Sequence, residues 1–359
     1  MTLAEELARH VRESPLAEPL GDGRVRCLAC GHRCPIFPGL PGVCKVRFND
    51  GGRLMAPHGY VNALHVDPIE KKPFFHALPG ARALSFGMLG CDLHCDYCQN
   101  WLSSQALRDP RADVYFQPIS AREIVRQAQL TGSQCVVSTY NEPLITAEWA
   151  AEVFREARRH GLVAGFVSNG NATPEVLDYL RPWLDLFKVD LKSFRDANYR
   201  KLGGRLEPIL DSIRRIHAMG FWLEVVTLVV PGFNDSEEEL REIAEFLASV
   251  SPEIPWHVTA FHPDYRMMGP RPTSPADLLR AVEAGRDAGL RYVYAGNLPG
   301  RLGDLENTRC WQCSAAVVER HGFRVLANRL RPGGLCPRCG ARIAGFWAPP
   351  ERKAEKEAS

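Results

Sequence analysis

Three cysteines near the end of the first quarter of the chain have a spacing that could hold a metal cluster with one open position. Cys91, Cys95 and Cys98 form a C-x3-C-x2-C pattern in the run GMLGCDLHCDYCQNW. Zinc sites and cuboidal iron–sulfur clusters normally take four protein ligands. Here three thiols share one short loop, and the next cysteine is Cys135. A cubane held by three thiolates leaves one iron open to a substrate or cofactor. A zinc knuckle completed by His94, or a disulfide, fits less well, because zinc ligands usually come as paired elements.

Two CxxC pairs near the C-terminus have the spacing of a zinc ribbon: Cys310–Cys313 and Cys336–Cys339. The segment between them, AAVVERHGFRVLANRL, is predicted to form a β-hairpin that turns at His321–Gly322. Such pairs bring four thiolates to one tetrahedral ion, which predicts a closed, structural site. We expect zinc, although a rubredoxin-like iron would use the same ligands.

A third set consists of Cys27, Cys30, Cys34 and Cys44, in the run CLACGHRCPIFPGLPGVC. It could hold zinc or an auxiliary iron–sulfur cluster, and His32 could compete as a ligand. The turn-rich spacer before the last cysteine can fold back but carries no signal specific for iron. We therefore favour zinc or a purely structural role.

The bulk composition is that of a cytoplasmic enzyme. The net charge is +2, with 24% charged residues, which does not favour a nucleic-acid partner. The start, MTLAEELARHVRESP, has no apolar stretch of the kind found in signal peptides. No apolar run approaches the roughly 20 residues that a membrane-spanning helix needs. Clustered cysteines in such a chain indicate metal ligation rather than disulfides.

Short apolar runs alternate with amphipathic stretches from about residue 81 to about residue 297. Strands are expected at 83–88, 135–139, 163–168, 185–190, 223–230, 256–261 and 291–296. Helices are expected at 121–130, 147–160, 174–181, 207–219, 236–249 and 275–288. This alternation predicts right-handed βαβ units and a parallel sheet. The stretch is shorter than the ~250 residues typical of an eight-stranded barrel, so we expect an α/β fold with a partial (β/α)6 barrel.

Five regions follow from this pattern. They are an N-terminal helix at 1–22, a Cys-rich module and connector at 23–80, the core barrel at 81–300, a zinc-ribbon-like module at 301–348 and a disordered tail at 349–359. The tail is charged and nearly free of apolar residues. The cysteine loop follows the first barrel strand, so the fold places it at the carboxyl ends of the strands, where such folds bind ligands.

Polar side chains recur at the ends of successive barrel strands. The runs are STYNEPL with Asn141 and Glu142, VSNG with Ser168 and Asn169, VDLK with Asp190 and Lys192, and TAFHPDY with His262. Glu224 lies within a later strand. Singly, each residue is more often a satisfied polar group at a strand end. Together, behind a cysteine loop, they predict one ligand site.

The cysteine loop resembles the signature of the radical S-adenosylmethionine (SAM) enzymes. Across residues 23 to about 348, the runs GCDLHCDYCQNW, TYNEPL, TLVVPGFND, VYAGN and ENTRCWQC resemble those of the AmmeMemoRadiSam-system radical SAM proteins. Their core is similar to the activating enzymes of pyruvate formate-lyase and other glycyl-radical enzymes. The resemblance implies a [4Fe-4S] cluster on Cys91, Cys95 and Cys98, with the amino and carboxylate groups of SAM on the open iron.

The resemblance also implies a set of SAM contacts: Tyr97, Asn141, Glu142, Ser168, Asn169, Asp190, Lys192 and His262. Tyr97 would meet the adenine, and His262 a ribose hydroxyl. Asn141-Glu142-Pro143 looks like a variant of the GGEP-type run that binds the methionine ammonium. Lys192 could pair with the SAM carboxylate. Val167 stands where formate-lyase activases have an aspartate for a cation, which puts that cation site in doubt.

The implied activity is reductive cleavage of SAM to a 5′-deoxyadenosyl radical, which abstracts hydrogen from an unidentified substrate. An activating enzyme of a glycyl-radical enzyme is an alternative, although such activases generally lack the C-terminal ribbon. A non-catalytic zinc-ribbon and iron–sulfur protein that binds nucleic acid is another, since residues 318–343 are rich in arginine. Implied partners are a flavodoxin- or ferredoxin-like electron donor and, from the family name, Memo-like and AMMECR-domain proteins.

Overall fold

The computed structural model describes residues 2–112 and 114–349, and an eight-stranded, mostly parallel sheet lies at its centre. The strand order is β16-β15-β14-β13-β12-β11-β9-β8. The bounds are β8 Ala63–Pro68, β9 Arg82–Gly87, β11 Cys135–Ser138, β12 Val163–Ser168, β13 Leu186–Asp190, β14 Trp222–Val229, β15 Trp256–Ala260 and β16 Val293–Gly296. The strands from β9 to β16 in this order run parallel, as the sequence predicts. β8 pairs antiparallel with β9 and was assigned to the Cys-rich module and connector by the sequence pattern.

Helices separate the parallel strands, and several begin at a hydroxyl cap. Their bounds are α2 Trp101–Ser104, α3 Ala121–Leu130, α4 Ala147–Arg159, α5 Pro174–Leu180, α6 Asp196–Lys201, α7 Leu206–Ala218, α8 Glu237–Val250 and α9 Pro275–Asp287, with 3-10 turns at Ile69–Lys71 and Pro143–Thr146. The hydroxyls of Ser120, Thr173 and Ser236 accept backbone N–H groups in the first turns of α3, α5 and α8.

Aromatic rings fill the space between the helices and the sheet. Phe154 of α4 packs against Phe86 and Phe166, with ring centroids 6.1 and 5.6 Å apart, and Phe166 packs in turn against Phe187. All four side chains are buried. Tilted and edge-on contacts of this kind are favourable beyond the area that they bury. They hold neighbouring strands in fixed relation, and with them the loops at the strand ends.

The expected N-terminal helix over residues 1–22 is wrong. The helix α1 covers only Leu3–Leu7, and strands β1 Val11–Glu13 and β2 Ala17–Gly21 follow it. Pro15 and Pro19 lack the N–H that a continuing helix would use. Asp22 and Gly23 both have positive φ, at 48° and 72°, and form the two-residue turn of a hairpin between β2 and β3. An Asp-Gly pair is a strong hairpin signal that outweighs the helical spacing before it.

Short strands complete the N-terminal part and pack on the barrel. They are β3 Arg24–Cys27, β4 Pro35–Ile36, β5 Phe48–Asp50, β6 Arg53–Pro57 and β7 Tyr60–Val61, and β7 pairs with β10 Gln117–Pro118. The guanidinium of Arg47, 1% exposed, donates to both carboxylate oxygens of Glu148 at the start of α4, at 2.9 and 2.7 Å. It also donates to the carbonyl of Ile145. These contacts fix the N-terminal strands against the barrel.

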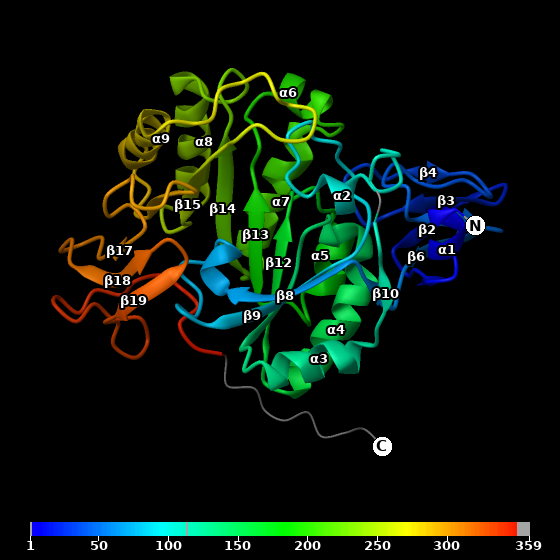
Figure 1. Ribbon diagram of the computed structural model, residues 1–359, viewed down its shortest axis with the longest axis horizontal. Helices are drawn as coiled ribbons and strands as arrows, with labels where there is room; N and C mark the ends of the chain where they lie inside the picture. The colour runs from blue at the N-terminus through cyan, green and yellow to red at the C-terminus, as the bar shows by residue number, and fades with distance from the viewer. Residues whose placement is uncertain (1, 113, 350–359) are drawn as a thin grey trace.

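The C-terminal part is a three-stranded sheet of β17 Thr308–Arg309, β18 Ala316–His321 and β19 Arg324–Asn328. β18 and β19 form the expected hairpin, with His321 opposite Arg324 across the turn. Figure 1 shows the blue N-terminal strands and the orange C-terminal strands at opposite ends of the molecule, with the parallel strands between them. Apart from residue 349, the expected tail at 349–359 lies outside the described residues. The five region boundaries stay predictions.

None of the helices in residues 2–112 and 114–349 has both the length and the apolar character needed to cross a bilayer.

Candidate functional site

A cavity of about 410 Å³ lies at the carboxyl ends of the parallel strands. Most of the residues selected from the sequence line it, namely Cys91, Cys95, Tyr97, Cys98, Asn141, Glu142, Ser168, Asn169, Asp190 and Lys192. They come from the cysteine loop after β9 and from the ends of β11, β12 and β13. The cavity falls within the about 300–1,000 Å³ range of small-molecule sites. The structure therefore places these residues around one space, while their individual roles stay predictions.

Two glycines set the path of the cysteine loop. At Gly87, the last residue of β9, an added Cβ would lie 2.7 Å from the carbonyl oxygen of Thr139, so β9 and the end of β11 touch. Gly90 has φ +94°, and a Cβ there would lie 2.8 Å from Cγ1 of Val46. Only glycine combines that conformation with that approach. Cys91 therefore starts the loop against both the barrel and the N-terminal strands.

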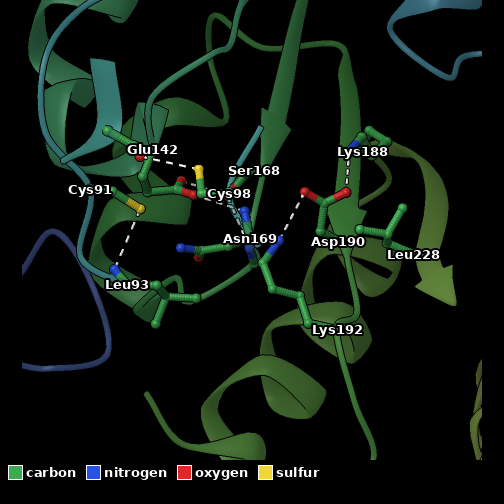
Figure 2. Close-up of polar contacts among 12 residues, drawn as sticks. Cys91, Leu93, Cys98, Glu142, Ser168, Asn169, Lys188, Asp190, Lys192 and Leu228 are labelled. Atoms are coloured by element: carbon green, nitrogen blue, oxygen red, sulfur yellow. Dashed lines mark hydrogen bonds and ion pairs between the residues drawn. The ribbon is translucent and has the colours of Figure 1, made fainter. Parts of the chain in front are cut away.

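Of the three loop cysteines, Cys95 is buried and Cys91 and Cys98 are half-buried. The backbone N–H of Leu93 donates to Sγ of Cys91 at 3.4 Å, as Figure 2 shows. Sγ of Cys98 lies 3.2 Å from the hydroxyl of Ser104. Burial raises the pKa of Cys95 to about 12, although the charge of Lys192 acts in the opposite direction. A bound metal would reverse this preference, because metal-bound thiols are deprotonated. Three such thiols on one cavity fit a cluster with one open iron.

Asp190 lies between two lysines on the same wall. Its carboxylate accepts from Lys188 and, at 3.3 Å, from Lys192 (Figure 2). Burial alone would raise the pKa of Asp190, but the charges of Lys188 and Lys192 lower it to about 2. For Lys192 the effects are reversed. Burial alone would lower its pKa, but the anionic groups around it, Asp190 first, raise the pKa of Lys192. Burial lowers the pKa of Lys188, so Lys192 carries the firmest positive charge of this wall.

Glu142 and Asp92 join the ends of neighbouring strands. Glu142 accepts from the hydroxyl of Ser168 and the backbone N–H of Asn169, both at 2.7 Å. Asp92 in the cysteine loop accepts from the amides of Asn169 and Asn171, also at 2.7 Å. Burial and the nearby charge of Asp92 raise the pKa of Glu142 to about 8. These bonds fix the cysteine loop to the β11 and β12 ends, so the cavity wall is preorganised.

Several residues of the cavity were not selected from the sequence. Lys188 shares a face of β13 with Asp190, and a buried lysine two positions from an aspartate is a signal that could have identified it. Tyr140 has φ 73°, and its hydroxyl lies 3.1 Å from Nζ of Lys72. Lys72 belongs to the connector, where no periodicity indicated a place in the barrel. Its Nζ also pairs with Asp67 at 2.9 Å.

His262 does not line the cysteine cavity. It lines a second cavity of about 510 Å³, where its Nδ1 lies 3.2 Å from Nε2 of Gln99. The two cavities share the residues Pro73, Gln99, Thr259 and Asn297. The turn of the C-terminal hairpin, at Gly322 and Phe323, forms part of the second cavity. The predicted ribose contact therefore lies on the neighbouring space rather than beside the cysteines.

The four C-terminal cysteines gather in the geometry of a single metal ion. Sγ of Cys310 lies 3.6 Å from Sγ of Cys339, and Sγ of Cys313 lies 3.7 Å from Sγ of Cys336. All four sulfur atoms lie within 4.8 Å of one another. A tetrahedral ion with metal–sulfur bonds of about 2.3 Å needs sulfur separations of about 3.8 Å. The arrangement is compatible with a metal-binding module.

Sequence comparisons relate this chain to radical SAM proteins. The pattern of the Radical SAM superfamily matches residues 87–247. The chain is 34% identical over 336 residues to the uncharacterized protein MJ0808 of Methanocaldococcus jannaschii, which covers 93% of this chain and 99% of that protein. It is 26% identical to a pyruvate formate-lyase-activating enzyme of Staphylococcus epidermidis, over 51% of this chain and 76% of that one. A radical SAM methyltransferase from Sphaerobacter thermophilus superposes with a TM-score of 0.47 at 15% identity, covering 63% of this chain and 70% of that one.

Proposed function

We propose, from the premise that this chain belongs to the radical SAM superfamily, that it cleaves SAM reductively and uses the product to abstract hydrogen from a substrate. The observation that carries the proposal is the common cavity of Cys91, Cys95 and Cys98 with Asp190 and Lys192. When bound there, a [4Fe-4S] cluster and SAM supply a 5′-deoxyadenosyl radical.

The residues of the cavity would bind and orient SAM. Three thiolates would hold the cluster and leave one iron for the amino acid group of SAM. Lys192 would donate to its carboxylate, with Asp190 keeping the ammonium in place. Asn141 Oδ1 already accepts from the backbone N–H of Met88, so this amide fixes the cavity wall and presents its neighbouring backbone to the methionine ammonium. Tyr97, 4% exposed, would shield the adenine from water.

The substrate would lie in the second cavity. That space adjoins the first through Gln99, Thr259 and Asn297, so a bound molecule could approach SAM without crossing solvent. Its walls include the apolar side chains of Phe261 and Phe323. This assignment would give His262 a substrate contact in place of the ribose contact expected from the sequence.

Activation of a glycyl-radical enzyme is a second candidate, because the chain is similar to pyruvate formate-lyase-activating enzymes over about half its length. In either case the electron would come from a flavodoxin- or ferredoxin-like donor in the cytoplasm. The same proposal includes four further points. The chain belongs to the AmmeMemoRadiSam group, and its core is a partial (β/α)6 barrel. The C-terminal cysteines bind zinc, and Memo-like and AMMECR-domain proteins are partners.

The test is spectroscopic and chemical. Protein reconstituted anaerobically and reduced should give an EPR signal that changes when SAM is added, and 5′-deoxyadenosine should accumulate. The matched control is Cys135→Ala, which removes a buried cysteine outside the cavity and should leave both results unchanged. Protein that binds no cubane after reconstitution would refute the proposal.

A further inference from the structure

The four N-terminal cysteines converge behind the cysteine loop. Cys27 ends β3, and its backbone N–H donates to the carbonyl of Cys34, 3.0 Å away across the β3–β4 ladder. Cys30 lies in the turn between these strands. The return loop brings the N–H of Val43 within 3.5 Å of Sγ of Cys34, and Cys44 follows directly. The charge of Cys27 acts on Cys30, Cys34 and Cys44, and that of Cys44 acts on Cys30, so the four thiols of this short segment lie near one another.

Their spacing differs from that of the C-terminal cysteines. The C-terminal sulfur atoms lie within 4.8 Å of one another, as a single ion requires. In the described parts of the chain, no other set of three His, Cys, Asp or Glu ligand atoms is so close, so the N-terminal set and the loop set Cys91, Cys95 and Cys98 are both looser. A cubane holds its thiolates farther apart than one ion does, because four irons and four sulfides lie between them.

We propose that Cys27, Cys30, Cys34 and Cys44 bind a second iron–sulfur cluster of the [4Fe-4S] type. With four thiolates its coordination is complete, so it has no open iron. His32 Nε2 lies 3.1 Å from the carbonyl of Asp92, and four thiolates complete the coordination of the cluster without this side chain. The looser spacing favours a cluster over the zinc or purely structural role preferred from the sequence.

The surroundings of this site suit a cluster. Cys27, Cys30 and Cys44 are buried, and Cys34 is half-buried. Beyond the N–H of Val43 at Cys34, backbone N–H groups of Val46 and Arg47 point at Cys44. Burial and hydrogen bonds to the sulfur atoms are features by which proteins hold and tune iron–sulfur clusters.

The proposed cluster lies directly against the loop that carries Cys91. A Cβ on Gly90 would lie 3.1 Å from the carbonyl of Cys44. The N–H of Gly31 donates to the carbonyl of Asn171, whose amide holds Asp92. The close approach of Gly90 to Cys44 and the hydrogen bond from Gly31 to Asn171 therefore link the N-terminal cysteines to the loop of the first cluster. This site does not depend on SAM cleavage, so the two proposals stand or fall separately.

The test is a metal and sulfide count on a variant that lacks the loop thiols. Cys91→Ala/Cys95→Ala/Cys98→Ala, reconstituted anaerobically, should retain about four irons and about four sulfides per chain, against about eight of each in the unmodified protein. Adding Cys30→Ala and Cys34→Ala, which leaves two thiolates at the N-terminal site, should remove the remaining sulfide. A rubredoxin-like iron at the C-terminal cysteines would contribute iron but no sulfide.

A triple variant with no sulfide and about two zinc ions per chain would overturn the proposal. Should the variants fail to fold, as judged by far-ultraviolet circular dichroism, Mössbauer spectra of the unmodified protein decide. Two cubane components, of which SAM perturbs one, support the second cluster, and a single cubane component contradicts it. Loss of the SAM effect alone would count against the proposed function and leave the second cluster intact.

Discussion

Asp190 and Glu224 are carboxylates of neighbouring strands with basic partners, and they differ in what surrounds them. Glu224 is fully buried and accepts from the N–H groups of Phe75 and His76, from Trp222 Nε1 and from His257 Nε2, at 2.7–3.0 Å. The side chain of Asp190 is 31% exposed and faces the cysteine cavity.

Asp190 and Glu224 differ in whether their basic partners have hydrogen-bond donors left for a ligand. Among the described residues, Asp190 is the one acceptor for the ammonium groups of both Lys188 and Lys192, although each ammonium has three donors. The carboxylate oxygens of Glu224 are fully used by protein donors and cannot accept from a ligand. The ammonium groups of Lys188 and Lys192 beside Asp190 keep N–H donors that can reach a ligand in the cavity. A saturated buried network indicates a structural role, and a partly used one indicates a binding site.

The largest expected effect tests the chemical side of this comparison. Cys95→Ala should reduce 5′-deoxyadenosine formation to below about one thousandth, because a cluster with two remaining ligands is lost. Because Cys95 is also buried among apolar side chains, urea unfolding of the metal-free variant and of the metal-free parent separates loss of the cluster from loss of stability. A variant that keeps its iron and its activity would show that the cavity does not hold the cluster.

The next effect tests the structural side. Glu224→Ala should lower the free energy of unfolding by about 3–5 kcal/mol, because four buried donors lose their acceptor. Urea unfolding measures this, with Glu245→Ala on the exposed face of α8 as the control. The control should change stability by less than about 0.5 kcal/mol. A similarly small change at Glu224 would remove the distinction between the two carboxylates.

A smaller effect is expected for the positive wall of the cavity. Lys192→Met should raise the dissociation constant of SAM roughly 10- to 100-fold, the range for a lost hydrogen bond to a charged group of about 1.5–3 kcal/mol. Equilibrium dialysis with the reconstituted protein measures it. Lys201→Met, on the exposed side of α6, is the matched control and should bind SAM normally. Equal affinities for the two variants would contradict the carboxylate contact.

The last effect concerns the pH dependence of stability at His76, whose backbone N–H donates to Glu224 and whose ring contacts Ala344 and Tyr294. Burial lowers the pKa of His76 to about 4, while an unfolded histidine titrates near about 6.5. As the pH falls from about 6.5 to about 4, the unfolded chain takes up a proton that the folded protein does not. Stability should therefore fall by up to about 1.4 kcal/mol per pH unit in this window. His76→Gln should flatten the slope, and His217→Gln, an exposed residue, should leave it unchanged. An unchanged slope in both would argue against a neutral His76.

Periodicity and spacing predicted the barrel strands and the cysteine loop, because both depend on local pattern. The same reasoning could not separate Glu224 from the site residues, since burial and partners come from distant segments such as Phe75 and His76. Lys72 and β8 were missed for a related reason. Their connector has no repeat, and only pairing with β9 gives it a place in the sheet. The Asp22–Gly23 turn was a readable signal that helical spacing obscured.

The order of the main sheet has a consequence for solubility. A sheet that is not closed offers two outer strands, here β8 and β16, to which another chain could add by backbone pairing. The N–H of Ala295 in β16 already donates to the carbonyl of Leu305 from the segment that follows. β8 is six residues long and ends in Asp67 and Pro68, a charge and a residue without a donor. The backbone bond at β16 and the charge and proline at the end of β8 thus oppose the addition of a strand from another chain, and with it aggregation.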